Sequence, residues 1–418
     1  MHVALAALFF FAILTLWVPA YWPVTVFQVG VFALAGIAVW RSRHSVPRFP
    51  YPLFPLLAAV VWGLLQWATG STVYGFDTQS AIVKWATFLA VFLVSFSLCR
   101  DPRMARWFRS AMLWFVFAVA VLATVQTFTS DKIFWLFSAP YTGVMGPILN
   151  HGHYAVFIEV ALPFALYEAV RRERGGLLYA GMAAVMYASV IASASRAGTV
   201  LATAEVVVAP ALLCAGGLAG GRAVGAALLR MAVLFAAFTA VVGWEHVRDR
   251  FLTPDPTAIR REFAVSSLHM IAAHPWSGVG LGAWPTAYPR YAILDPGTFA
   301  NQAHSDWLQW TAEGGIPFGI AMATLFCWCV PPAFRSVWGL GVIAVFLHAA
   351  VDYPFSRPAL GAWPILIIGM LAAREAAGER TSGERPAAGA PRAGSARPAG
   401  MEVPYGPASP TLRVLLRK

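Results

Sequence analysis

Long apolar runs are the feature that most limits how this chain can fold. Twelve of them occur between residues 3 and 373, and a helix needs roughly 20 apolar residues to cross a bilayer. With 59% hydrophobic and 12% charged residues, the 418-residue chain has more apolar surface than a soluble core can bury. We therefore predict an all-α integral membrane protein with about 12 transmembrane helices. The predicted spans are 3–19, 22–40, 52–69, 81–99, 107–128, 152–170, 177–193, 197–217, 225–244, 306–330, 337–350 and 359–373.

The net charge of +11 is explained by where the basic residues lie. If the N-terminus is cytoplasmic, 21 of the 30 Lys and Arg fall in the inward connections or after residue 373, as the positive-inside rule requires. This placement predicts cytoplasmic N- and C-termini, and it favours membrane lipid over nucleic acid as the partner of the basic residues. The remaining cations fall at or near the outer side: Lys84, Lys132, Arg196, Arg248, Arg250, Arg260, Arg261, Arg290 and Arg357.

The two ends of the chain differ in composition from the spans between them. Residues 1–20 also fit a signal peptide, because a short apolar stretch ends in small residues, although a charged leading region is nearly absent. Residues 374–418 are rich in Ala, Gly, Pro, Arg and Ser and predict a disordered cytoplasmic tail. The predicted domains are thus a membrane domain over 1–373 and this tail.

One long connection, residues 245–304, separates the ninth and tenth predicted spans and is expected on the outer, periplasmic side. Connections of this length are usually functional. Its stretch TAIRREFAVSSLHMIAAHP, residues 257–275, has apolar residues at helical spacing and predicts an amphipathic helix. The helix should end before Pro275, since the residue before a proline avoids the helical conformation.

Two neighbouring motifs carry a family resemblance. HPWSGVGLGAWPTAYPRY (274–291) is followed by NQAHSDWLQWTAEGGIPFG (301–319), and the pair resembles the signature region of the O-antigen ligase and polymerase superfamily. SASRAG (193–198) and HAAVDYPFSRP (348–358) are similar to further features of that family. GPILNHGHYAVFI (146–158) departs from the family pattern, which has asparagines spaced two apart where this chain has Asn150, His151 and His153.

The resemblance implies a multi-pass glycosyltransferase of the bacterial inner membrane with a periplasmic active site and no cofactor. Its donor would be a glycan on an undecaprenyl pyrophosphate lipid, and its acceptor a second glycan or the lipid A core. A ligase and a polymerase would share the donor and differ in the acceptor. The stretch HAAVDYPF tilts the interpretation slightly toward polymerisation.

Cations and a histidine at the outer ends of the predicted spans suit this reaction. Displacement at an anomeric carbon with a pyrophosphate leaving group needs positive charge where negative charge develops. Arg196 and Arg260 are expected to bind the pyrophosphate, since guanidinium groups grip phosphate oxygens bidentately. Arg260 is favoured over Arg261 by the family spacing, and Arg261 is assigned to substrate binding. His304, with an ordinary pKa near ~6.5, is the predicted base for the acceptor hydroxyl.

Further polar residues at the same level are predicted to contact substrate: Asn150, His153, Asp306, His348 and Asp352. Either of the two aspartates could instead act as the base or hold a divalent metal. The outer loops contain no Asp-x-Asp pair, however, and the four cysteines lie within or at the ends of apolar runs without zinc-site spacing. We therefore predict a metal-independent reaction.

Three carboxylates, Glu159, Glu205 and Glu313, are predicted to lie within spans. Such groups are functional candidates, and they could also neutralise the outer arginines or hydrogen-bond the helix bundle. They leave open a second function, a secondary transporter or flippase of a lipid-linked or amphiphilic substrate. A scaffold with a decayed site is disfavoured because the His304 motif and both arginine positions are intact.

Overall fold

Helices make up the regular structure of the residues that the computed structural model describes, which are 1–43, 49–139, 144–172, 175–217, 219–242, 257–294, 297 and 299–383. In these ranges two isolated β-bridges are present and no strand. The contacts discussed below lie within residues 1–378, which form one unit. The helices are α1 (His2–Leu14), α2 (Trp22–Ser42), α3 (Leu53–Thr69), α4 (Gly75–Cys99), α5 (Pro102–Thr129), α6 (His151–Glu159), α7 (Leu162–Arg171), α8 (Gly176–Ala192), α9 (Arg196–Ala215), α10 (Gly221–Val242), α12 (Thr257–Ala273), α13 (Trp284–Tyr291), α14 (Asp306–Ser336), α15 (Leu340–His348), the 3-10 turn η1 (Pro354–Ser356) and α16 (Pro358–Gly383).

Seven segments of the described chain are long and apolar enough to cross a membrane. Three shorter apolar helices, α1, α3 and α8, accompany them. The predicted span at 337–350 contains only the nine residues of α15. The all-helical membrane architecture is therefore confirmed, whereas the count of twelve spans and the outer placement of the long connection stay predictions. The seven segments are Trp22–Arg41, Gly75–Cys99, Pro102–Thr129, His151–Arg171, Arg196–Ala215, Asp306–Ser336 and Pro358–Gly378.

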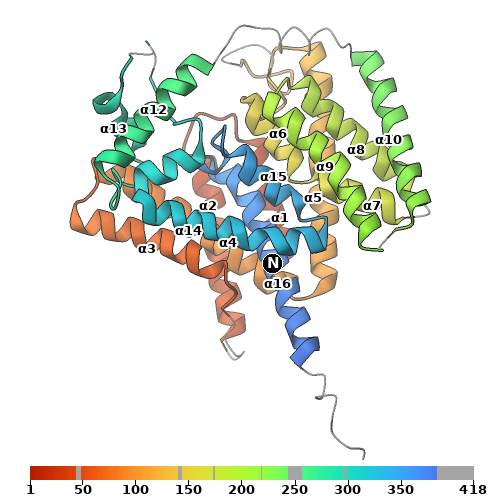
Figure 1. The fold of residues 1–418 in the computed structure, drawn as a ribbon, viewed down its shortest axis with the longest axis horizontal. Helices are drawn as coiled ribbons and strands as arrows, with labels where there is room; N and C mark the ends of the chain where they lie inside the picture. The colour runs from red at the N-terminus through yellow and green to blue at the C-terminus, as the bar shows by residue number, and fades with distance from the viewer. Residues whose placement is uncertain are drawn as a thin grey trace, which may run out of the picture. The chain divides into compact units, whose positions relative to one another are not determined.

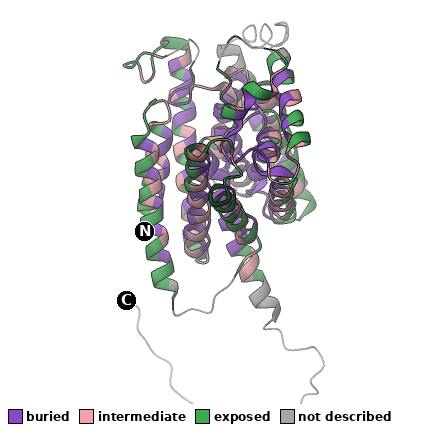
Figure 2. Ribbon diagram, turned by 90° about the vertical axis from the view of Figure 1, so that its left-hand side faces the viewer, coloured by how far each residue is buried: buried purple, intermediate pink, exposed green. Residues whose placement is uncertain are grey.

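The centre of the bundle is built on α16 and on the α6–α7 pair, whose residues are mostly buried. Buried residues concentrate in the middle of the bundle (Figure 2). Trp363 of α16 is fully buried, and its ring contacts Phe9, Phe115 and Phe157 on three other helices. Large apolar side chains on outward faces of α2 and α3 stay exposed, as expected for helices that face lipid. Because Phe9 belongs to this core, α1 is an integral part of the bundle.

The sixth predicted span is broken into α6 and α7 at residues 160–161. Pro163 has no backbone N–H and cannot donate to the carbonyl of Glu159 four residues earlier. At the break, Gly341 of α15 lies so close to the carbonyls of Glu159 and Val160 that a Cβ there would stand 2.7 and 2.6 Å from their oxygens. The break thus lets α15 approach the middle of the span.

A second break interrupts α14 at Gly315, which has φ 74° and ψ 177°. Pro317 cannot donate to the Glu313 carbonyl, and that oxygen instead accepts bonds from Gly280 N at 3.0 Å and from the Gln66 side-chain amide at 2.9 Å. On the other side of the break, Ile316 N donates to the carbonyl of Pro275 at 2.7 Å. The glycine-rich motif 274–282 therefore supplies hydrogen-bond partners for backbone groups left unpaired at the break in α14.

The long connection folds onto the first half of α14 (Figure 1). The predicted amphipathic helix is confirmed as α12, which ends at Ala273, just before His274-Pro275. Its Phe263 and Met270 are buried in a small apolar cluster together with Trp284 and Tyr288 of α13. This cluster fixes α12 over the start of α14.

Near the C-terminus, α16 continues to Gly383 and so includes the first residues of the stretch predicted as a tail. The rest of that stretch, 384–418, lies outside the described residues, as do Arg248 and Arg250.

The Gly278→Ala variant should be strongly destabilised, because Gly278 has φ 66° and its Cβ would overlap the Glu313 carbonyl. We expect the free energy of unfolding to fall by about 2 to 4 kcal/mol, the sum of the left-handed backbone cost and overpacking. Heating in detergent with a thiol-reactive dye, which reports exposure of buried Cys99 and Cys329, measures the change. Gly70→Ala is the matched control, since Gly70 has φ 67° and open space around it, and should cost only about 1 kcal/mol. Equal losses in both variants would show that the contact with α14 is unimportant.

Candidate functional site

Asp352 is the centre of a buried polar cluster at one end of the bundle. Its carboxylate oxygens lie 3.7 Å from His153 Nε2 and 4.0 Å from His348 Nε2, and its Oδ1 accepts a hydrogen bond from Tyr353 N at 2.9 Å. Asp352, His153 and His348 are all at least 97% buried. A carboxylate removed from water needs such partners, so the two histidines and the aspartate form one electrostatic unit.

His348 connects this unit to the middle of the candidate span His151–Arg171. Its Nδ1 lies 2.9 and 3.1 Å from the two carboxylate oxygens of Glu159, which is fully buried at the α6 break. One ring nitrogen of His348 therefore faces Glu159 and the other faces Asp352. Of the two roles considered for Glu159, hydrogen bonding within the bundle is the one seen.

The start of α6 is shaped to fit against Asp352. The Asn150 side chain accepts hydrogen bonds from Gly152 N at 2.8 Å and His153 N at 3.1 Å, which is the usual geometry of a helix N-cap. A Cβ at Gly152 would overlap Asp352 Oδ2. The sequence Asn-His-Gly-His thus caps α6, leaves room for the carboxylate and presents His153 to it.

Asp306 holds the segment that carries Asp352. Its carboxylate accepts bonds from Phe355 N at 2.9 Å and Ser356 Oγ at 3.3 Å, and its backbone N donates to the carbonyls of Ala349 and Asp352 at 2.8 and 3.0 Å. All four contacts are with residues 349–356. The structure therefore places Asp306 as a support of this segment, and its predicted contact with substrate stays a prediction.

His304 lies at the edge of the cluster, two residues before α14, in a left-handed conformation with φ 54°. Its ring is stacked on Phe263 of α12, with centroids 5.8 Å apart, and meets the Tyr353 ring edge-on at 4.9 Å. Burial of the ring lowers the pKa of His304 below its ordinary value, with Asp352 opposing and Arg260 adding to this effect. Within the described part of the chain, its Nδ1 is buried and has no hydrogen-bond partner. A neutral ring with an unused nitrogen is suited to accept a proton.

The predicted arginines occupy different positions around the cluster. Arg260 and Arg261 are both exposed on α12, and Arg260 Nη1 donates to the Val351 carbonyl at 3.4 Å, directly beside Asp352. Arg196 is exposed at the first residue of α9. There α9 closely approaches α6, because a Cβ at Gly198 would overlap Ala155. Arg196 thus begins the helix that packs against α6, which carries His153, and Arg260 contacts the segment that carries Asp352.

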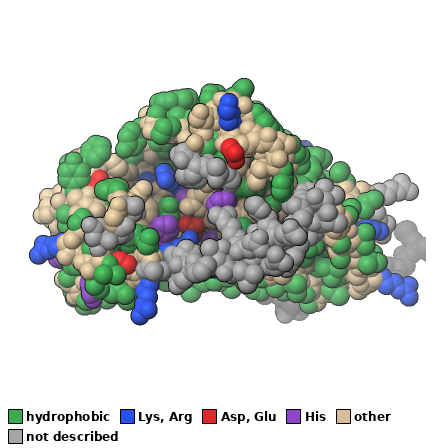
Figure 3. Space-filling view, turned by 90° about the horizontal axis from the view of Figure 1, so that it is seen from above, with side chains coloured by type: hydrophobic (Ala, Val, Ile, Leu, Met, Phe, Trp, Pro, Cys, Tyr) green, Lys and Arg blue, Asp and Glu red, His purple; other side chains and the backbone are tan. Residues whose placement is uncertain are grey.

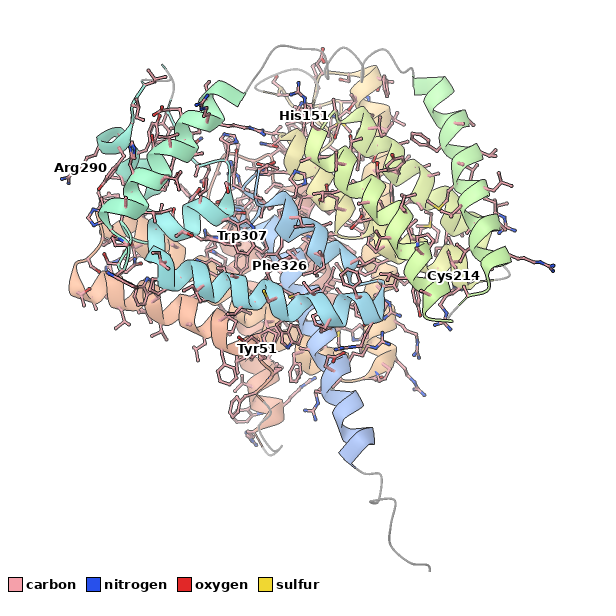
Figure 4. The ribbon with its side chains drawn as sticks, viewed as in Figure 1. Tyr51, His151, Cys214, Arg290, Trp307 and Phe326 are labelled. Carbon is pink, nitrogen blue, oxygen red and sulfur yellow. The ribbon has the colours of Figure 1, made fainter. Side chains whose placement is uncertain are left out.

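The start of α6 lies at the end of the bundle that is uppermost in Figure 1. Viewed from above, histidine, acidic and basic side chains gather in a hollow near the middle of this face (Figure 3). His151 at the start of α6 lies at this end, while Arg290 points away from α13 at the edge of the molecule (Figure 4). No group of three or more His, Cys, Asp or Glu in the described ranges is arranged to hold a metal ion.

Comparison with known proteins identifies part of the chain. Residues 181–323 match the family model described as O-antigen ligase. This region matches the O-antigen ligase family. The match confirms the resemblance found in the sequence, and no curated protein matches the chain. The O-antigen ligase region contains Arg196, Arg260 and His304, while His153 and Asp352 come from the flanking helices.

The structure brings together most of the residues chosen from the sequence of this O-antigen ligase region and its flanks. His153, His304, His348, Asp352 and Arg260 share one cluster, and Asn150 and Asp306 brace it from two sides. Two contributors were missed. Tyr353 touches both His153 and His304 edge-on, at 4.7 and 4.9 Å, and Phe263 stacks on His304. Phe263 is one of the apolar residues of the predicted helix 257–275 and Tyr353 lies in the motif HAAVDYPFSRP, but neither was assigned to the site.

The pKa of the His304 ring should lie below the ordinary histidine value in the folded protein. In ¹H–¹³C NMR spectra of histidine-labelled protein in detergent, with His304→Ala used for assignment, we expect its titration midpoint to lie below the ordinary histidine value of about 6.5. Removing the opposing charge with Asp352→Asn should lower the His304 pKa further, and Arg260→Gln should raise it. Shifts in the reverse directions would contradict the arrangement of charges around the ring.

Proposed function

We propose that this protein transfers a glycan from an undecaprenyl pyrophosphate carrier to an acceptor sugar at the periplasmic face of the bacterial inner membrane, without a metal ion. The O-antigen ligase family supports glycan transfer of the ligase or polymerase type in general. The carrier, the face of the membrane and the roles of single residues are parts of the proposal.

One observation carries the proposal: a single helix, α12, provides both a cation and a wall for the candidate base. Arg260 reaches the carbonyl beside Asp352, and one turn later Phe263 stacks on the His304 ring. A pyrophosphate bound by Arg260 would therefore lie close to a histidine that is neutral at pH 7. Glycosyl transfer from a pyrophosphate requires positive charge to stabilise the leaving group and a proton acceptor for the attacking hydroxyl.

The reaction is a displacement at the anomeric carbon of the donor glycan. The acceptor hydroxyl oxygen forms a bond to this carbon while the bond to the pyrophosphate oxygen breaks. The hydroxyl proton passes to a ring nitrogen of His304, and the lipid pyrophosphate departs as an anion neutralised by Arg260 and Arg196. The proton then returns to solvent, so that no group on the protein is consumed.

The buried charges behind His304 keep it in position for this step. Asp352 lies between His153 and His348, and its backbone is tied to Asp306. Tyr353, the next residue, touches the rings of His153 and His304. We assign Glu159 and His348 as positioning residues, because they act on the substrate side only through Asp352.

The position of the cluster favours a transferase over a transporter. Its members lie at helix ends: His153 in the first turn of α6, His304 before α14, and Asp352 after α15. Proton-coupled carriers place their ionisable groups near the middle of the membrane at a repeat interface. In this protein the mid-span carboxylate that joins the cluster, Glu159, is bonded to His348.

Transfer of a lipid-linked oligosaccharide by the purified protein tests the proposal. His304→Ala should lower the transfer rate by at least about 10²-fold, the usual contribution of a general base. Arg260→Ala and Arg196→Ala should lower it by about 10²-fold through the loss of leaving-group stabilisation. Arg290→Ala, which removes an exposed arginine that points away from the cluster, is the control and should keep full activity.

Reactions with and without lipid A core decide which acceptor is used. Product on the lipid A core identifies a ligase, and a lengthened lipid-linked glycan identifies a polymerase. Full activity of folded His304→Ala and Arg196→Ala would refute the mechanism. Activity lost with a chelator and restored by a divalent metal would move the central role to the aspartates.

A Glu159→Gln change should separate positioning from binding. The amide keeps the shape of the carboxylate but removes the charge that faces His348, so we expect kcat to fall about tenfold or more while KM for the donor stays within about twofold. The control is Glu205→Gln, which neutralises another buried carboxylate, one whose oxygens lack hydrogen-bond partners in the described structure. A rise in KM with unchanged kcat would place Glu159 in binding instead.

A further inference from the structure

A cavity of about 630 Å³ lies beside the candidate site and has no role in the proposed reaction. Its walls come from the end of α1, the start of α2, the first half of α4 and residues 356–359. Apart from Gly282, its lining lies outside the O-antigen ligase match. The volume falls within the range of small-molecule and cofactor sites.

Two cations line this cavity. Lys84 lies nine residues after the start of α4, about 13 Å along the helix. Arg357 directly follows Ser356, whose hydroxyl bonds to Asp306. In the described part of the chain neither cation forms an ion pair. A lysine this far inside a membrane helix is costly and marks a functional position.

The neighbouring carboxylates are engaged elsewhere. Asp306 and Glu313 lie within electrostatic range of Lys84. Asp306 is bonded to Phe355 and Ser356, and Glu313 is bonded to Gly282 N and Gln309 at 2.8 Å each. The cavity's own Asp77 accepts the Thr286 hydroxyl at 2.7 Å. The two cations therefore retain donors for an anionic ligand.

The rest of the lining mixes apolar side chains with the polar side chains of Thr15, Thr25, Gln28 and Ser80, and its outer apolar residues face the surroundings of the helices. Tyr21, Phe76 and Val83 line the cavity and are 85%, 62% and 41% exposed. Val83 is adjacent to Lys84 on α4, which is one of the candidate spans. A ligand in this cavity would thus have an anionic end near the cations and an apolar end toward lipid.

We propose that the cavity binds the phosphate-bearing headgroup of a membrane lipid, with Lys84 and Arg357 on the phosphate and the α1, α2 and α4 residues on the first carbons of its chains. This site is separate from the Arg196 and Arg260 side of the cluster. Residues 353–357 link the two, since Tyr353 touches His153 and His304, while Arg357 lines the cavity and lies within electrostatic range of His153. Lipid binding does not depend on the proposed glycan transfer.

Calorimetric titration of the full-length protein in neutral detergent with dioctanoyl phosphatidic acid tests the proposal. Dioctanoylglycerol, which lacks the phosphate, and inorganic phosphate, which lacks the chains, are the comparison ligands. Phosphatidic acid should bind at least about tenfold more tightly than either, because both parts of the site contribute. Equal binding of dioctanoylglycerol would overturn the role of the cations, and equal binding of inorganic phosphate would overturn the lipid.

Variants locate the binding in the cavity. The double variant Lys84→Gln, Arg357→Gln should lose about tenfold or more in affinity for phosphatidic acid. The matched control, Lys132→Gln with Arg290→Gln, removes two exposed cations outside the cavity and should bind like the unmodified protein. Val83→Trp, which fills the cavity mouth without changing charge, should also weaken binding. Unchanged affinity in both cavity variants would refute the site, whether or not the protein transfers glycans.

Discussion

The backbone carbonyl of Glu313, which has no donor within its own helix, governs how this end of the molecule is built. A backbone oxygen exposed by Pro317 inside a membrane helix must find another donor, and it finds Gly280 and Gln66. The glycine-rich segment is therefore tied to the break in α14. Since α12 precedes this segment directly and shares an apolar cluster with it, the break also fixes where α12 lies. The positions of Arg260 and of Phe263, which stacks on His304, follow from the placement of α12.

A second constraint is that several ionisable side chains are buried away from water. Glu159, His348, Asp352 and His153 form a line of acidic and basic side chains in which each buried carboxylate faces at least one histidine. Such an arrangement keeps an aspartate next to a candidate base without leaving its charge uncompensated. It also shows why the departure from the family pattern at residues 150–153 matters: the glycine and histidine found there are the residues that fit against Asp352.

Sequence reasoning predicted those parts of the structure that depend on local pattern. The ends of α12, the helical runs and the gathering of His304, Asp352 and Arg260 follow from apolar spacing, proline position and motif resemblance. Other features depend on contacts between distant segments. The pairing of Glu159 with His348 joins residues 189 positions apart, and no spacing rule reveals it. The preference for Arg260 over Arg261 as the contact likewise depends on the position of Val351 in space. Apolar runs alone also do not determine the number of spans, because a run can fold into a helix broken at a proline or into a helix too short to cross the membrane.

The lysine in α4 has a consequence for how the protein is made. A lysine at the centre of a membrane helix costs roughly 2.5–3.5 kcal/mol. Lys84 lies in the first half of α4, and α4 offsets its cost with the apolar residues of its second half and with α3, which packs along it. The carboxylates within electrostatic range of Lys84 belong to α14, far later in the chain. Because α14 follows α4 in the chain, Lys84 enters the membrane before these carboxylates are made, and this end of the bundle is completed only when the last third of the chain is translated.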